Sequence, residues 1–505
     1  MHGIRASLLV SFMVVLASTA RTGGAAEPPL RPKVGMNLSG VFDWSREWPF
    51  VDVFKHSRPW FKHGPGEFVW DEQGYPLLKP GQSVDTLLCR EISGNYPRGK
   101  YVATYEGSGK VEIKRFDVKK VLQETKGRIE FEVEPAHGGI QVVIGASDPK
   151  DPIRNLKVWM PGFENAKSPF HPLYLKRLEP FGAIRFMDWQ RTNNSPVKSW
   201  KERAKPTDAR WTNDAGVPVE VMVDLANTCK ANPWFCMPHQ ADDEYVREFA
   251  KVVKDKLDPA LKVYVEYSNE VWNGQFRQAR YAHDEGKKLG LSDNGFQGQL
   301  RYYAQRSVQV FKIWEEVFGD KKRLVRVLAS QAVSPWASEQ VLTWKDAAKH
   351  ADALAVAPYF GHSFGSPKTA DTVAKMKVED LLAALAKEVD GENKGFIQKQ
   401  QALAKQHGLE LVAYEGGQHL AGHGGSENNQ ALTDLFIAAN RHPQMYDLYQ
   451  QHLRNWFEAG GGLYMVFSNV SAPSKWGSWG VLEAQDQPEE KAHKYRAVVE
   501  FIRRK

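Results

Sequence analysis

Cysteine is scarce in this chain, with three cysteines among 505 residues. Cys229 and Cys236 could form a disulfide, which would leave Cys89 unpaired. A small extracellular domain stapled by disulfides would carry a denser set, so we expect a hydrophobic core to hold this fold together. The 42% of hydrophobic residues agrees with that expectation.

Blocks of like charge and long apolar runs are also missing. The formal net charge is +7, which is mild for this length, and Lys and Arg do not gather into a dense run. A nucleic acid partner is therefore not expected. Beyond the N-terminal region, no segment is long and apolar enough to cross a bilayer, so we expect no membrane span.

The N-terminus has the pattern of a signal peptide over residues 1–26. Arg5 precedes a short apolar run at residues 8–17, and small residues such as Ala20 and Ala26 follow. The alternative is a membrane anchor, which is disfavoured because the apolar run is short for a bilayer span. We expect cleavage and secretion, into the extracellular space or the periplasm.

Several common catalytic motifs are absent from the sequence. No Gly-rich phosphate loop follows a predicted strand, and no G-x-S-x-G nucleophile elbow occurs. His419 and His423 lie in a Gly-rich stretch, where the helical spacing of metal ligands is implausible. We expect neither a metal nor another cofactor.

What the chain does contain is a regular alternation of short apolar runs and amphipathic stretches. Eight runs are predicted to be strands, at residues 34–38, 183–187, 234–237, 262–267, 324–329, 353–357, 409–413 and 462–467. Residues 218–231 fit both a strand and a helix; we interpret them as a helix, because a strand would leave two strands without a covering helix. Eight such repeats predict a closed (β/α)8 TIM barrel.

Residues 64–165 interrupt this alternation. They contain six short alternating runs separated by Gly, Pro and Asp, which predicts a small all-β sandwich inserted in the first βα loop. Residues 27–63 and 166–505 then form the barrel. Because active sites of such barrels lie at the C-terminal face, the insertion is expected beside the site, either binding substrate or acting as a brace.

Two glutamates directly follow predicted strands. Glu270 lies in VEYSNEVWN after the fourth strand, and Glu415 lies in LVAYEGGQH after the seventh. Burial at a strand end raises a carboxyl pKa, although one such residue could be an ordinary surface carboxylate or an ion-pair partner. Two of them facing each other across the barrel mouth suit glycosidic cleavage, with retention at a separation of about 5–5.5 Å and inversion at a wider one.

The Asn269–Glu270 pair and Glu415, in this order, resemble clan A of the glycoside hydrolases, the retaining (β/α)8-barrel glycosidases. The resemblance covers the barrel and not the insertion. It implies that Glu270 is the acid/base and Glu415 the nucleophile. It also implies that Asn269 binds the 2-hydroxyl of the substrate, where contacts strengthen in the transition state.

Three further positions match the same family pattern in order. Arg185, in the second strand, corresponds to an arginine whose charge keeps the nucleophile ionised, although it could be an ordinary barrel ion pair. Tyr359 corresponds to a tyrosine that donates a hydrogen bond to the nucleophile. His239 corresponds to a histidine that contacts the sugar.

The family's tryptophan at the end of strand eight is replaced here by Phe467. Trp476 and Trp479 follow shortly after and could fold back to take its place. Asp43 and Trp44, on the first loop, are further candidate substrate-binding residues. Other loop tryptophans, each of which could equally be packed in the interior, are Trp60, Trp189, Trp272 and Trp336.

These features predict a secreted enzyme that hydrolyses a β-linked polysaccharide or oligosaccharide by double displacement. Two alternatives remain open at this point. One is a carbohydrate-binding protein on a barrel that no longer turns over, and the other is a transglycosylase that uses the same two carboxylates. Glucan, mannan, xylan and furanoside substrates all occur on such barrels.

Overall fold

The computed structural model describes residues 33–114 and 116–504. The predicted signal peptide at residues 1–26 lies outside the described residues. Within the described ranges, none of the helices combines the length and the apolar character that a membrane crossing requires.

Eight parallel strands form a closed barrel, as the sequence predicts. The strands, in barrel order, are β1 Val34–Asn37, β12 Ala183–Arg185, β13 Asn232–Met237, β14 Val263–Tyr267, β15 Leu324–Ala329, β16 Ala353–Val356, β17 Glu410–Ala413 and β18 Tyr464–Val466. Closure occurs at β1, where Gly35 pairs with Ala183 on one side and Met465 on the other. Nearly every strand residue is buried, because helices cover the outside and side chains fill the inside.

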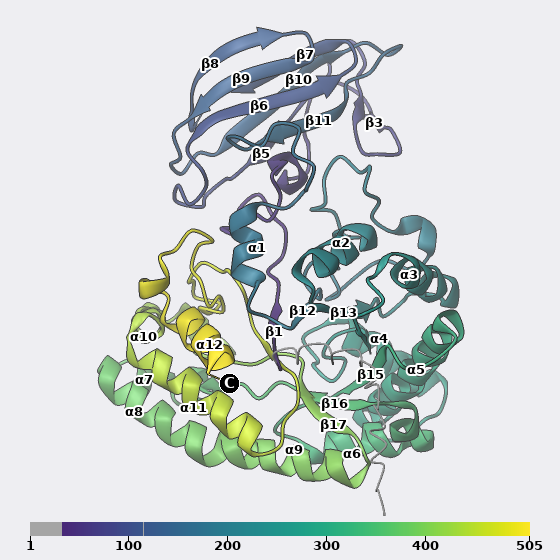
Figure 1. The fold of residues 1–505 in the computed structure, drawn as a ribbon, viewed down its shortest axis with the longest axis vertical. Coiled ribbons are helices and arrows are strands. Elements are labelled where there is room, and N and C mark those ends of the chain that lie inside the picture. The colour runs from purple at the N-terminus through teal and green to yellow at the C-terminus, as the bar shows by residue number, and fades with distance from the viewer. Residues whose placement is uncertain (1–32, 115, 505) are drawn as a thin grey trace, which may run out of the picture. The chain divides into compact units, whose positions relative to one another are not determined.

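The helices surround the barrel (Figure 1). Their bounds are α1 Pro172–Leu178, α2 Val219–Cys229, α3 Asp243–Lys256, α4 Arg277–Lys288, α5 Gly295–Phe318, α6 Pro335–Thr343, α7 Ala370–Val373, α8 Val378–Glu388, α9 Lys394–Gln406, α10 Gln430–Arg441, α11 Gln444–Glu458 and α12 His493–Arg503. Pro443 separates two of these helices, because α10 ends before it and α11 begins after it.

The ambiguous segment is a helix, α2. Its alternating valines are buried, as are residues on other sides of the helix, because α2 packs between the barrel and α3. The helix ends at Lys230, whose φ of 51° lies in the left-handed region and turns the chain into β13. The count of strands that places Glu270 after the fourth and Glu415 after the seventh is therefore confirmed.

The chain between β1 and α1 forms two four-stranded antiparallel sheets, with strand orders β2-β5-β10-β7 and β11-β6-β9-β8. The strands of this region are β2 Phe61–His63, β3 Val69–Trp70, β4 Pro76–Leu77, β5 Ser83–Leu88, β6 Gly99–Glu106, β7 Gly109–Lys114, β8 Val118–Thr125, β9 Arg128–Val133, β10 Ile140–Ser147 and β11 Arg154–Trp159. Alternate residues of β9 and β10 are buried in a shared apolar core. The domain limits at 64 and 165 stay a prediction.

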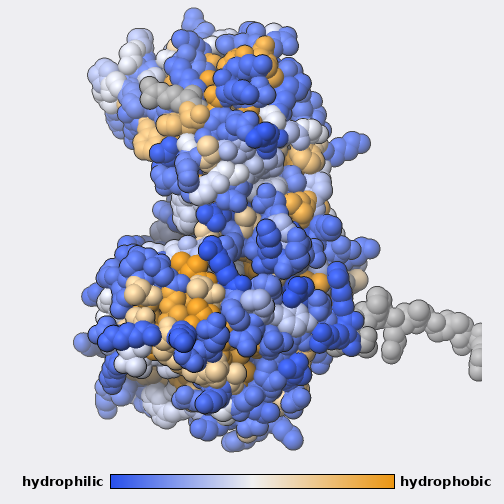
Figure 2. All heavy atoms as spheres, turned by 90° about the vertical axis from the view of Figure 1, so that its left-hand side faces the viewer, coloured by the Kyte–Doolittle hydropathy of each residue, from blue (hydrophilic) through white to orange (hydrophobic). Residues whose placement is uncertain are grey.

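The cysteines are all free, so the pairing of Cys229 with Cys236 is not formed. Cys229 ends α2 outside the barrel, whereas the Sγ of Cys236 points inside, 3.4 Å from a carboxylate oxygen of Glu266. Two thiols on opposite sides of a strand cannot meet. Figure 2 shows hydrophilic side chains over most of one face, with hydrophobic ones gathered on its lower part and others near the top.

Candidate active site

The strand ends of the barrel bring the two candidate carboxylates to the same face. Glu270 follows β14 by three residues, and Glu415 follows β17 by two. All strands are parallel, so their carboxyl ends share one rim of the barrel. Arg185, the last residue of β12, is fully buried beneath that rim.

Glu415 is bound by one cation and one hydroxyl group. Arg185 donates from Nη1 to Oε1 of Glu415 at 2.9 Å. Tyr359 donates from its hydroxyl to the other oxygen, Oε2, at 3.0 Å. Only 6% of Glu415 is exposed, so both contacts act in a partly desolvated environment and hold the carboxylate in place.

Glu270 has neutral partners. The hydroxyl of Tyr414 donates to Oε1 of Glu270 at 2.9 Å, and Nδ2 of Asn273 donates to Oε2 at 2.9 Å. No cation bonds to it among the residues that the structure describes. Its φ of 42° lies in the left-handed region, which is costly for a residue with a side chain and is often found at functional sites.

The different partners decide which carboxyl group carries a proton. Burial raises the pKa of Glu270 and of Glu415, and the charge of Glu270 raises that of Glu415 further. Arg185 opposes the rise, and it does so by direct contact only at Glu415. Contact with the guanidinium therefore favours the ionised form of Glu415 against the burial that raises its pKa to about 8, whereas no described cation contacts Glu270.

Arg185 joins more groups than the sequence suggests. Besides Glu415, its guanidinium donates to Asn37 at 3.2 Å, to Asn269 at 2.8 Å and to Glu266 at 2.8 Å. Glu266, in the middle of β14, is fully buried and also accepts from the indole of Trp234 at 2.8 Å. Glu266 is not among the residues predicted from the sequence, although a charged residue inside the apolar run KVYVEY indicates a buried polar contact.

Asn269 lies beside both acids and has a fixed orientation. Its Oδ1 accepts from Arg185, and its Nδ2 donates to Oδ1 of Asn193 at 3.1 Å. Gln278 holds Asn193 in turn, at 2.7 Å. These contacts leave Asn269 2% exposed at the rim.

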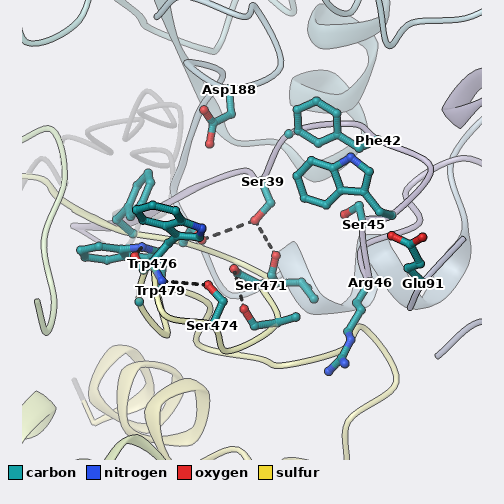
Figure 3. A pocket seen from close by; sticks show the side chains of 17 residues that line it. Ser39, Phe42, Ser45, Arg46, Glu91, Asp188, Ser471, Ser474, Trp476 and Trp479 are labelled. Carbon is teal, nitrogen blue, oxygen red and sulfur yellow. Dashed lines mark hydrogen bonds between the residues drawn. The ribbon is translucent and has the colours of Figure 1, made fainter. Parts of the chain in front are cut away.

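Two cavities open at this rim. One has a volume of about 370 Å³ and is lined by Glu270, Trp272, Tyr359, His362 and His419 among others. The other has a volume of about 570 Å³ and is lined by Phe42, Trp44, Trp476 and Trp479 with a set of serines (Figure 3).

Trp479 and Tyr359 lie between the two cavities, with ring centroids 5.7 Å apart. Phe467 lies at the end of β18, and the Trp479 ring packs edge-on against it at 5.9 Å. Trp479 therefore folds back over the strand-eight position where Phe467 replaces the expected tryptophan. Trp476 is 63% exposed and Trp44 is 54% exposed, so both present their rings to the cavity that they line.

Asp43 and His239, like Arg185, Asn269 and Glu415, line neither cavity. The carboxylate of Asp43 is 2.6 Å from Nη2 of Arg58. The ring of His239 packs edge-on against Tyr281 at 5.3 Å. Burial lowers the pKa of His239 to about 4, so this imidazole is neutral near neutral pH.

The remaining loop tryptophans also differ in whether they line a cavity. Trp272 lines the smaller cavity, whereas Trp189 is buried in the barrel core. Trp336 stacks on Phe296 at 6.0 Å, and the indole of Trp60 donates to the carbonyl of Gly74 in the β-sheet region. Of these four, only Trp272 lines either of the two cavities.

No protein-family model matches the chain, and no curated protein matches it. Among solved structures, it is similar to a GH51 arabinofuranosidase from Xanthomonas axonopodis pv. citri, with 12% identity, a TM-score of 0.36 and coverage of 60% of this chain. The match spans 61% of that arabinofuranosidase.

Two further solved structures are similar. One is a GH5-4 broad specificity endoglucanase from Clostridium acetobutylicum, with 11% identity, a TM-score of 0.38 and coverage of 65% of this chain and 88% of that one. The other is a beta-glucosidase from Thermotoga maritima, with 13% identity, a TM-score of 0.37 and coverage of 65% and 84%.

Proposed function

We propose that this protein is a secreted retaining glycoside hydrolase that cleaves a β-linked glycan by double displacement. The observation that carries the proposal is the pair of buried carboxyl groups at one barrel rim, one bound to a guanidinium and the other to neutral donors. Their partners match the two roles that the chemistry requires, a nucleophile that stays ionised and an acid that keeps its proton.

The first step forms a glycosyl-enzyme ester. An ionised oxygen of Glu415 attacks the anomeric carbon, and the bond from that carbon to the leaving oxygen breaks. Glu270 gives its proton to the leaving oxygen, so the departing sugar leaves as a neutral alcohol. Asn269, fixed by Arg185 and Asn193, presents its amide beside the two acids as the group that binds the 2-hydroxyl.

The second step returns the enzyme to its starting state. Glu270, now a carboxylate, takes a proton from a water molecule, and the hydroxide attacks the anomeric carbon. The ester bond to Glu415 breaks, and the carboxylate returns to its contacts with Arg185 and Tyr359. Two displacements at one carbon leave its configuration unchanged, which is retention.

The test is loss of hydrolysis on substitution of either acid. Glu270→Ala and Glu415→Ala should each lose nearly all release of reducing sugar from a panel of glucan, mannan and xylan. A reduction of 10³-fold or more is expected on a substrate whose leaving group needs protonation, roughly the contribution of a positioned acid or nucleophile.

A matched control is Glu410→Gln, because Glu410 begins β17, the strand that Glu415 follows, and is exposed at the opposite end of that strand. This variant should keep full activity. Circular dichroism melts should show that all three variants fold. Full activity of a folded Glu270→Ala or Glu415→Ala variant would overturn the proposal.

A further inference from the structure

The larger cavity contains a carboxylate to which the proposed mechanism gives no role. Asp188 lies three residues after the end of β12 and lines the cavity together with Ser39 and the aromatic residues. Figure 3 shows Asp188 and Ser39 between Phe42 on one side and Trp476 and Trp479 on the other. The carboxylate thus lies in an opening bounded by aromatic rings.

Asp188 has no hydrogen-bond or ion-pair partner for its carboxylate in the described part of the chain. The two nearby arginines are engaged elsewhere. Arg185 bonds to the catalytic rim, and Arg191 lies over the ring of Phe42 at 4.8 Å and 3.8 Å from Asp214. Asp188 is partly exposed and lines the cavity, so its carboxylate oxygens are free to accept hydrogen bonds from a ligand that enters it.

The loop that carries Asp188 is rigid. Backbone N–H groups of Gln190, Arg191 and Thr192 donate to carbonyls of Phe186, Asp188 and Met187, which closes consecutive turns. The side chain of Gln190 bonds in both directions to the backbone of Cys236 in β13, at 3.1 and 2.8 Å. Asp188 is therefore held in place before any ligand binds, which reduces the entropic cost of binding.

The charge of Asp188 also acts on Glu415, the proposed nucleophile. Its charge contributes to the raised pKa of Glu415 and of Glu47. Its own pKa is raised to about 6 by burial, against the lowering effect of Arg185 and Arg191. Near neutral pH the group is an anion that can only accept hydrogen bonds.

We propose that Asp188 binds the sugar ring in the larger cavity, accepting hydrogen bonds from two adjacent hydroxyl groups while the aromatic walls contact the ring faces. The ligand class is a neutral sugar with an unsubstituted vicinal diol, because a diol offers two O–H donors at the spacing of two carboxylate oxygens. The inference rests on the proposed function, since it takes this cavity as part of the substrate cleft. It adds a specificity-determining residue that the family resemblance does not supply.

The experiment measures binding without turnover. In a Glu270→Gln background, titration calorimetry gives the Kd for the β-1,4-linked hexamers of glucose, mannose and xylose, and for the hexamer of glucosamine. Adding Asp188→Asn should weaken binding of the preferred neutral hexamer about 10- to 100-fold, the size of one or two charge-assisted hydrogen bonds. Asp224→Asn, on the exposed side of α2 in the same βα unit, is the matched control and should leave Kd unchanged.

A pH series separates binding by Asp188 from a structural effect. In the Glu270→Gln parent, affinity should fall as the pH drops through about 6, because protonation of Asp188 removes an acceptor. Arg185, Arg191, Glu47 and Glu415 surround the group and are present in both proteins, so the Asp188→Asn variant should lose only this component of the pH dependence.

Each outcome of these experiments either supports or overturns the inference. Equal affinities and pH profiles in the two proteins would overturn the inference, and so would failure of the parent to bind any neutral hexamer. Tighter binding of the glucosamine hexamer that depends on Asp188 would show that Asp188 binds an ammonium group and not a diol. This result would overturn the proposed ligand class. Binding as expected, together with a wild-type enzyme that hydrolyses none of the hexamers, would support the inference and contradict the proposed function.

Discussion

At Glu270 and Glu415, the same burial acts on two carboxyl groups with different neighbours. Glu415 touches a guanidinium, whereas Glu270 touches a tyrosine hydroxyl and an amide. Proton transfer in the proposed mechanism depends on that difference and not on burial alone, because burial raises both pKa values.

Tyr414→Phe tests the environment of Glu270. The Tyr414 hydroxyl stabilises the ionised form of Glu270 and thus lowers its pKa against the effect of burial. Without it the pKa of Glu270 rises, and Glu270 keeps its proton to higher pH. The alkaline limb of kcat/KM should move up by as much as about one pH unit, the equivalent of one ordinary hydrogen bond.

The readout is a pH profile of kcat/KM for the wild type and Tyr414→Phe. Tyr446→Phe removes a hydroxyl that bonds to Glu500 on the outer helices, and this control should leave the profile unchanged. A downward shift of the alkaline limb in Tyr414→Phe would contradict the assignment of the proton to Glu270.

Sequence patterns identify some of the site residues, whereas others are recognised only from the tertiary structure. Glu270, Glu415 and Asn269 follow strands and belong to local motifs, so they can be identified before the fold is known. Asp43 and His239 occupy suitable loops, but their contacts with Arg58 and Tyr281 depend on the tertiary structure. Asp188 carries no motif, and its isolation from donors appears only once the neighbouring loops are placed.

Among the elements, the loop between β18 and α12 contributes two tryptophans, Trp476 and Trp479, to the larger cavity. The backbone carbonyl of Ser478, which lies between them, connects this loop to the rest of the barrel. That carbonyl accepts from Nζ of Lys494 in α12 at 2.5 Å and from Nε2 of Gln418 at 2.9 Å. The last helix and the segment after Glu415 thus position the tryptophans together.

Lys494→Met should loosen this loop while keeping most of the packing of the lysine stem. The expected result is a several-fold rise in KM with a smaller change in kcat, because the aromatic wall binds substrate but does not react. Lys491→Met, at an exposed position just before α12, is the control. An unchanged KM, or a loss confined to kcat, would contradict a positioning role for Lys494.

Elements with large apolar residues on one or both faces could be predicted, and those without them could not. The barrel strands are largely apolar because both of their faces are covered. Helix α4 has no apolar pattern from which to predict it, because its buried face consists of Gln278, Ala279, Ala282 and Gly286 rather than large apolar residues. Strand β8 shows no alternation, because nearly all of it is exposed.

For the molecule as a whole, the β-sheet region contributes to the proposed cleft. Glu91, just beyond β5, lines the larger cavity, and the adjacent Arg90 donates its backbone N–H to the carbonyl of Asp43 at 2.8 Å. Arg58, which leads into β2, binds the Asp43 side chain. One lining residue of the cavity, Glu91, therefore comes from outside the barrel, in a part of the chain that the family resemblance does not cover.

The assignment of Glu415 as nucleophile is tested most directly by trapping the glycosyl-enzyme ester. In Glu270→Gln, dinitrophenyl β-glycosides of glucose, mannose and xylose need no acid to leave, and the ester persists because the base is missing. Mass spectrometry of the intact protein should show one added glycosyl unit, and peptide mapping should place it on Glu415. Attachment to another residue, or turnover with an inverted anomer and no adduct, would contradict the account.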